Sequence, residues 1–91
     1  MSNNKLEGNQ AIVVDVRSPA EYAGGFYPGA INIPVETIES IATQFGDKDR
    51  EITLYCASGG RSSYALQVLQ SVGYTNLTNG GGLMTMMSGL Q

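Results

Sequence analysis

The 91-residue chain contains no histidine and no tryptophan, and Cys56 is its only cysteine. Without histidine, a cysteine–histidine pair of the thiol-protease kind cannot form. A single cysteine also excludes an intrachain disulfide, a C-x-x-C redox pair and a zinc site built from thiolates alone. Any group that Cys56 accepts covalently must therefore pass to a second molecule, because the chain has no other thiol.

Basic residues and long hydrophobic runs are also scarce. Five basic and eight acidic residues give a net charge of −3, and the basic residues are scattered, so the charge pattern of a nucleic-acid-binding protein is missing. The longest apolar runs, such as residues 11–14, are too short for a membrane span or the core of a signal peptide. We therefore expect a cytoplasmic protein with no nucleic-acid or membrane partner.

The hydrophobic content of 42% is sufficient for one domain with a modest core, and we expect residues 1–91 to form it. Glycines and prolines divide the chain into alternating strand and helix patterns, and no internal repeat is visible. This alternation predicts an α/β fold in which a parallel sheet of about four strands is flanked by helices on both faces.

The expected elements follow from apolar runs and from residues that begin or end helices. The run AIVVDV at 11–16 is typical of a strand buried on both faces. Ser18, Pro19 and Glu21 have the spacing of a capping box that begins a helix. The other expected elements are a strand at 30–33, a helix from Pro34 that Gly46 ends, a strand at 51–56, a helix from near Ser62 that Gly73 ends, a short strand at 76–78, a glycine turn at 80–82 and a helix from 83 to about 90.

The strand at 51–56 delivers Cys56 into a loop at the strand end where parallel α/β sheets bind their ligands. Small, flexible residues let the loop backbone curl until several N–H groups point at one spot, and the following helix adds the positive end of its dipole. Both effects favour a thiolate, so we expect Cys56 to be an unusually acidic nucleophile. The residues of this cradle are Ala57, Ser58, Gly59, Gly60, Arg61 and Ser62.

Arg61 is a permanent cation with a planar fork of donors, which suits an oxyanion such as a sulfonate. We interpret it as an anion-binding residue rather than a solvated surface arginine. The hydroxyl of Ser58 could add a donor to a bound anion, whereas Ser62 could do so or cap the helix, and capping is the favoured interpretation.

Two charged residues, Asp15 and Arg17, lie at the end of another strand, at the same sheet edge as Cys56, and Glu21 follows them. They could serve as a catalytic carboxylate and cation. A structural role is favoured, because an ion pair among them, with Glu21 also capping its helix, explains their presence without chemistry.

Three motifs occur in order: DVRSPAEY at 15–22, PGAINIP at 28–34 and CASGGRS at 56–62. In these motifs the chain resembles a single-domain rhodanese, a thiosulfate or protein-persulfide sulfurtransferase, over nearly its whole length. The resemblance implies that Cys56 takes the outer sulfur of a donor as a persulfide and that Arg61 orients the donor. It implies a small anionic sulfur donor and an acceptor that is a thiol, including a protein thiol, or a cyanide-like anion. It implies no metal and no organic cofactor.

The loop length argues against the nearest other chemistry. Four residues separate Cys56 from Arg61, whereas related phosphatases of this fold place five residues there. The tighter ring suits a terminal sulfur atom better than a tetrahedral phosphoryl group, so phosphatase activity is the less favoured interpretation.

The chain departs from the family pattern at two places. Phe26 follows Gly25 where the family usually has glycine and histidine, and the segment containing Met84, Met86 and Met87 stands where an aromatic residue is common.

Two alternative functions stay open. One is a non-catalytic rhodanese-like binding or regulatory module, if Phe26 or Tyr27 blocks the pocket. The other is a redox-sensing thiol, because an acidic, exposed cysteine is readily oxidised.

Overall fold

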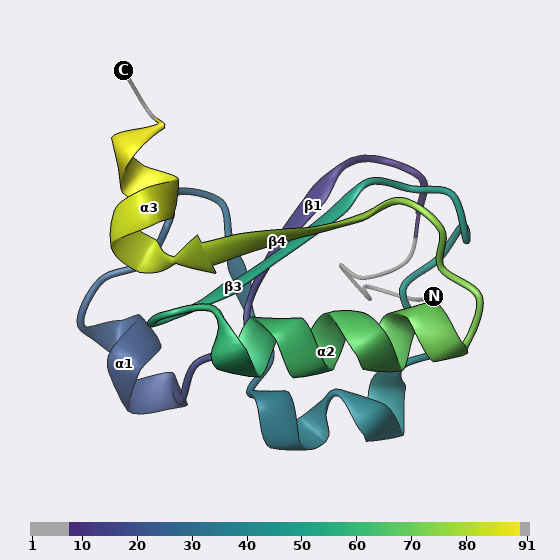
Figure 1. Cartoon of the computed structure of the whole chain (residues 1–91), viewed down its shortest axis with the longest axis horizontal. Helices are drawn as coiled ribbons and strands as arrows, with labels where there is room; N and C mark the ends of the chain where they lie inside the picture. Colours follow the sequence, from purple (N-terminus) through teal and green to yellow (C-terminus); the bar gives the residue numbers. More distant parts are fainter. Residues whose placement is uncertain (1–7, 90–91) are drawn as a thin grey trace, which may run out of the picture.

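The computed structural model describes residues 8–89, which form a four-stranded parallel sheet with the strand order β2-β1-β3-β4 (Figure 1). The predicted α/β fold with a parallel sheet of about four strands is confirmed. Within residues 8–89 no helix has the length and apolar character that crossing a membrane requires. The strands are β1 (Ile12–Asp15), β2 (Ile31–Asn32), β3 (Ile52–Cys56) and β4 (Leu77–Gly82); the helices are α1 (Pro19–Ala23), η1 (Val35–Thr37), η2 (Glu39–Ile41), α2 (Gly60–Ser71) and α3 (Leu83–Ser88).

The two central strands, β1 and β3, carry the core. Val14 on β1 pairs with Leu54 on β3, and both side chains are fully buried. Ala65 and Leu69, one turn apart on α2, pack into the same cluster. In Figure 1, α2 and the two 3₁₀ helices lie on one side of the sheet, while α3 rises from the tip of β4 on the other. Because the central strands are buried on both faces, their sequences are nearly continuous apolar runs.

The segment after Pro34 differs from the prediction, because it forms two short 3₁₀ helices, η1 and η2, instead of one α-helix. The hydroxyls of Thr37 and Ser40 donate to the carbonyls of Pro34 and Thr37, each three residues earlier. Such local side-chain bonds compete with the backbone bonds of an α-helix. The core-facing side chains of Ile38 and Phe45 are still fully buried, so the apolar pattern located the buried face correctly.

The glycine segment also differs from the prediction. Residues 80–82 are not a turn but the second half of β4, which pairs with β3 up to Gly82 opposite Cys56. A Cβ on Gly80 would lie 2.4 Å from the sulfur of Met86, and a Cβ on Gly82 would lie 2.2 Å from the carbonyl oxygen of Ala57. Gly80 and Gly82 are therefore required by close packing against neighbouring chain segments, whereas Gly81 has a positive φ of 81° at a register shift in the pairing with β3.

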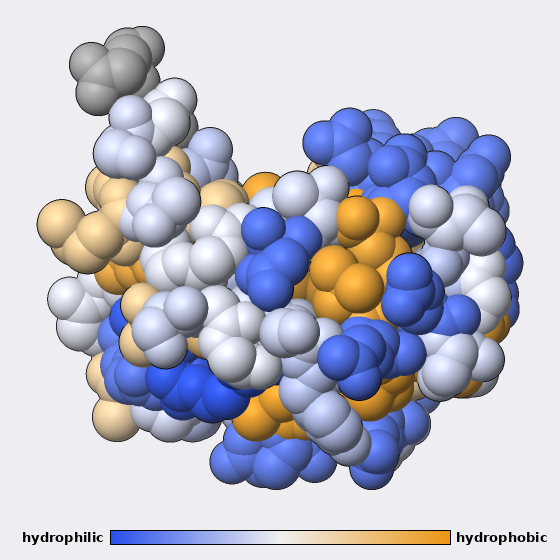
Figure 2. Space-filling model, viewed as in Figure 1, coloured by the Kyte–Doolittle hydropathy of each residue, from blue (hydrophilic) through white to orange (hydrophobic). Residues whose placement is uncertain are grey.

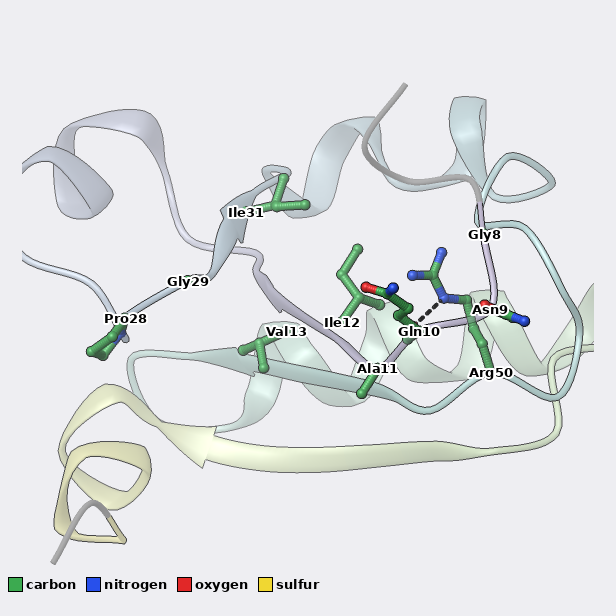
Figure 3. A pocket seen from close by; sticks show the side chains of 10 residues that line it. All are labelled: Gly8, Asn9, Gln10, Ala11, Ile12, Val13, Pro28, Gly29, Ile31 and Arg50. Carbon is green, nitrogen blue, oxygen red and sulfur yellow. Dashed lines mark hydrogen bonds between the residues drawn. The ribbon is translucent and has the colours of Figure 1, made fainter. Parts of the chain in front are cut away.

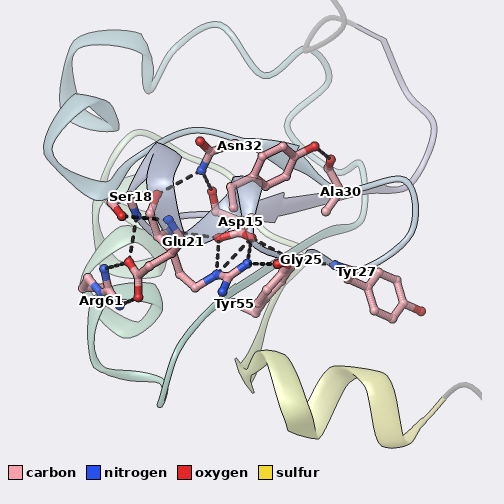
Figure 4. Close-up of polar contacts among 11 residues, drawn as sticks. Asp15, Ser18, Glu21, Gly25, Tyr27, Ala30, Asn32, Tyr55 and Arg61 are labelled. Carbon is pink, nitrogen blue, oxygen red and sulfur yellow. Dashed lines mark hydrogen bonds and ion pairs between the residues drawn. The ribbon is translucent and has the colours of Figure 1, made fainter.

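A buried polar network joins the ends of β1 and β3 (Figure 4). The guanidinium of Arg17 donates to both carboxylate oxygens of Asp15, with an Nη2–Oδ2 distance of 2.7 Å, and to the carbonyl of Gly25. The hydroxyl of Tyr55 donates to Asp15 Oδ2 at 2.8 Å. Burial raises the pKa of Tyr55 to about 12, so this hydroxyl keeps its proton at neutral pH. The network fixes the strand ends beside which Cys56 lies.

Candidate active site

Parallel pairing brings the carboxyl ends of the strands to one edge of the sheet. Tyr55, next to Cys56 on β3, pairs with Asp15 at the end of β1, and Cys56 itself pairs with Gly82 at the end of β4. Only residues 57–59 separate Cys56 from the first residue of α2, Gly60. The sulfur therefore lies between a strand end and a helix start, as the sequence predicts.

Gly59 shapes the turn between β3 and α2. It is the residue that precedes α2, and its φ of 105° lies in the left-handed region that glycine tolerates. In this conformation its backbone N–H donates to Cys56 Sγ at 2.9 Å. The helix thus begins at Gly60, two residues before the predicted start near Ser62, and the N–H groups of its first turn belong to the cysteine loop.

Ser62 does not cap α2, because Gly59 occupies the N-cap position. Its side chain is fully buried, with Oγ 3.6 Å from Cys56 Sγ and 2.7 Å from the side-chain oxygen of Asn79. The same oxygen of Asn79 accepts the backbone N–H of Gly81 at 2.9 Å. The serine hydroxyl is thus held beside the sulfur by an asparagine from β4.

The surroundings of the sulfur change the acidity of Cys56. Burial alone would raise the pKa of the thiol, but the backbone N–H and the hydroxyl of Ser62, with the N–H groups of Ser58 and Gly59, outweigh it. Together these donors lower the pKa of Cys56 to about 7. The arrangement can therefore hold a thiolate at neutral pH without help from a histidine.

This acidity makes the rate of thiol alkylation a direct test. We expect the rate of reaction of Cys56 with iodoacetamide to reach half its maximum near pH 7, because the protonated thiol that prevails below this pH is unreactive. Cys56 is the only cysteine, so the signal comes from one residue. The urea-unfolded chain is the control and should show the ordinary midpoint of about pH 8.5. A folded protein with that same midpoint would contradict the assignment.

The charged residues near Cys56 form two separate ion pairs, whereas the sequence analysis expected Asp15, Arg17 and Glu21 to interact with one another. Asp15 pairs with Arg17, whereas Glu21 pairs with Arg61 through bonds of 2.8 Å and 3.1 Å (Figure 4). Glu21 also accepts the backbone N–H of Ser18, and Ser18 accepts the N–H of Glu21, so the predicted capping box is present. Arg61, predicted to orient an anion, is in this structure engaged with a carboxylate from α1.

Two residues of the site were missed by the sequence analysis. Asn79 supports Ser62, and Gly82 lets β4 approach the carbonyl of Ala57. Neither lies near Cys56 in the sequence, and the segment 80–82 resembled a turn. The one signal that could have indicated them is the glycine run itself, because consecutive glycines also mark close approach of two backbones.

A groove of about 490 Å³ lies elsewhere on the protein, between the amino-terminal part of β1 and the segment that precedes β2 (Figure 3). Its lining includes Gln10, Ile12, Pro28 and Arg50, but no cysteine or serine. It adjoins the start of β1, whereas Cys56 lies at the end of β3. We therefore do not assign the chemistry to this groove.

Comparison with known proteins shows the family of the chain. The family model of the rhodanese-like domain matches residues 2–83. The thiosulfate sulfurtransferase PspE of Escherichia coli is 42% identical over 71 residues, which cover 77% of this chain and 68% of that protein. The human thiosulfate:glutathione sulfurtransferase is 36% identical over 87 residues, which cover 81% of this chain and 76% of that protein.

A solved structure has the same fold. The structure described as a rhodanese with anions from E. coli superposes with a TM-score of 0.76 at 38% sequence identity. The match covers 82% of this chain and 89% of that one. The α/β fold with a four-stranded parallel sheet is therefore shared with a protein of known structure.

Proposed function

This chain belongs to the rhodanese-like domain family, and we propose that it is a sulfurtransferase in which Cys56 carries the transferred sulfur as a persulfide. The observation that carries the proposal is the environment of the sulfur. Cys56 Sγ accepts a backbone N–H at 2.9 Å at the start of α2, and the pKa of its thiol is lowered to about 7. A thiolate is thus available at neutral pH to attack a sulfur donor.

In the proposed reaction the Cys56 thiolate attacks the outer sulfur of thiosulfate. A bond forms between Sγ and this sulfur, the bond from this sulfur to the sulfonate group breaks, and sulfite leaves with the electron pair. An acceptor thiolate or cyanide then attacks the outer sulfur, and its bond to Sγ breaks to regenerate the thiolate. Each step exchanges one bond to sulfur for another, so the cycle needs no oxidant or reductant.

The cysteine loop supplies the proposed binding groups by its main chain. We assign the N–H groups of Ala57, Ser58, Gly59, Gly60 and Ser62 to the cradle that holds the negative sulfur, because the loop and the first turn of α2 surround Cys56. Arg61 lies in the first turn of α2 and is assigned to the anionic end of the donor. The acceptor, a thiol or a cyanide-like anion, would enter after sulfite has left.

The proposal is tested by mass spectrometry of the intact protein. Incubation of the reduced protein with thiosulfate should add the mass of one sulfur atom, and addition of cyanide should remove this mass and produce thiocyanate. Cys56→Ser is the matched control, because it replaces the nucleophilic sulfur and changes little else, and it should show neither result. If the wild-type protein gains no sulfur and yields no thiocyanate, the proposal is wrong.

A second candidate function is supported by the burial of the sulfur. Only 1% of Cys56 is exposed, so a donor reaches Sγ only if neighbouring groups move. In the alternative, the domain is a binding or regulatory module that does not turn over. Phe26, one of the two residues suspected of blocking the pocket, is exposed and stacks on Tyr22 with a ring-centroid distance of 4.1 Å. Persulfide formation without release of thiocyanate would favour this alternative.

A further inference from the structure

Arg61, in the first turn of α2 beside the cysteine loop, is held by a carboxylate from α1. Its Nη1 lies 2.8 Å from Glu21 Oε1 and its Nη2 lies 3.1 Å from Glu21 Oε2, so the two planar groups form a pair of parallel bonds (Figure 4). About 39% of the arginine side chain and 37% of the glutamate side chain are exposed. Figure 2 shows strongly hydrophilic surface where α1 meets the first turn of α2, the two elements that carry this pair.

The other described cations are not placed to replace Arg61. Arg17 is buried against Asp15. Lys48 donates to the carbonyl of Val72, at the far end of α2, and Arg50 donates to the carbonyl of Gln10, which precedes β1. Among residues 8–89, Arg61 is therefore the cation that an anion entering the cysteine loop would meet, and this cation is already neutralised.

We propose that Glu21 is a specificity-determining residue that competes with the sulfur donor for Arg61. The inference rests on the proposed function and deepens it. A donor with two negative charges, such as thiosulfate, must displace the carboxylate or approach it against repulsion. A donor of lower charge, such as an organic persulfide or thiosulfonate, meets less opposition. The site is thus selective for sulfur donors of low charge over inorganic dianions.

The carboxylate is fixed in place and keeps its charge. Glu21 Oε1 also accepts the backbone N–H of Ser18 at 2.9 Å, so the capping box holds the carboxylate in reach of Arg61. The bonds from Arg61, followed by that from Ser18, lower the pKa of Glu21 to about 2. The competition therefore operates throughout the pH range in which the Cys56 thiolate exists, and it is a permanent property of the site.

The substitution Glu21→Gln removes the negative charge of the side chain and keeps its shape. A glutamine can still accept the N–H of Ser18 and one bond from Arg61, and glutamine serves in capping boxes as glutamate does. Glu51→Gln is the matched control, because Glu51 is exposed and precedes β3, at the opposite end of the strand from Cys56. It makes the same change in net charge away from the site.

The experiment compares steady-state kinetics with thiosulfate and with benzenethiosulfonate, a monoanion, using cyanide as the acceptor. We expect Glu21→Gln to lower KM for thiosulfate about threefold, as the loss of one exposed charge interaction allows, and KM for the monoanion by less. The kcat of Glu21→Gln should equal that of the wild-type protein with both donors. In Glu51→Gln neither kcat nor KM should change. In an Arg61→Met background, Glu21→Gln should no longer change either KM.

The outcomes separate this inference from the proposed function. If the wild-type protein turns over neither donor, the proposed function fails and the inference fails with it. If it turns over both, but Glu21→Gln changes the ratio of the two KM values no more than Glu51→Gln does, the inference is overturned and the function stands. If the effect persists without the Arg61 guanidinium, Glu21 does not act by competing for it, and the inference is also overturned.

Discussion

Replacing Gly82 by alanine is expected to lower the rate of persulfide formation about 100-fold, the loss that a displacement of roughly 1 Å in a reacting group can produce. The added Cβ would lie 2.2 Å from the carbonyl oxygen and 3.0 Å from the carbonyl carbon of Ala57. Both are backbone atoms, so the clash is relieved only if the cysteine loop or β4 shifts. Either shift moves the loop N–H groups away from the positions at which they stabilise the thiolate.

The measurement is the single-turnover rate of sulfur uptake from thiosulfate, together with the midpoint of the pH dependence of alkylation. In Gly82→Ala this midpoint should rise toward that of an ordinary cysteine. Gly24→Ala is the matched control, because its Cβ would lie at an ordinary distance of 3.5 Å from the carbonyl oxygen of Glu21, and its φ of −81° suits alanine. Equal rates in the two variants would show that the close approach of β4 does not shape the site.

Replacing Arg17 by methionine is expected to lower the free energy of unfolding by about 3–5 kcal/mol, because it leaves a buried carboxylate without its cation. Asp15 is fully buried and Arg17 is 7% exposed, and three side-chain bonds join them. The rate of persulfide formation by the folded fraction should change little, since neither residue is assigned to the donor or the acceptor.

Urea unfolding measures this loss, and Arg61→Met supplies the comparison. Arg61 also pairs with a carboxylate, but both side chains of that pair are more than a third exposed, so its loss should lower the free energy of unfolding far less than the loss of Arg17 does. The two arginines thus have opposite expected profiles. Arg17 should affect stability and Arg61 should affect the use of the donor. Equal stability losses, or a slow but fully stable Arg17→Met, would contradict this division.

The features predicted from the sequence are those that neighbouring residues determine. Ser18, Pro19 and Glu21 define a capping box within four positions, and the structure has it. The apolar strand that ends at Cys56, followed by small residues, was sufficient to place the cysteine between a strand and a helix. The alternation of strands and helices gave the parallel sheet, because parallel neighbours require such crossovers.

The features that escaped prediction depend on residues far apart in the chain. The pair of Glu21 and Arg61 spans 40 positions, and a charge count does not show which carboxylate a given arginine will meet. The contact between Gly82 and Ala57 is likewise set by the pairing of β3 with β4. A further difference, the 3₁₀ helices after Pro34, arose where hydroxyl side chains competed for backbone carbonyls and the apolar pattern carried no information about them.

The cysteine loop is finished by a segment that follows it in the chain. Ser62 relies on Asn79, and Ala57 packs against Gly82, so residues 57–62 acquire their final shape only when residues 77–82 have paired with β3. During synthesis of the chain, we therefore expect the thiol of Cys56 to reach its full acidity only after β4 has been made and has paired with β3.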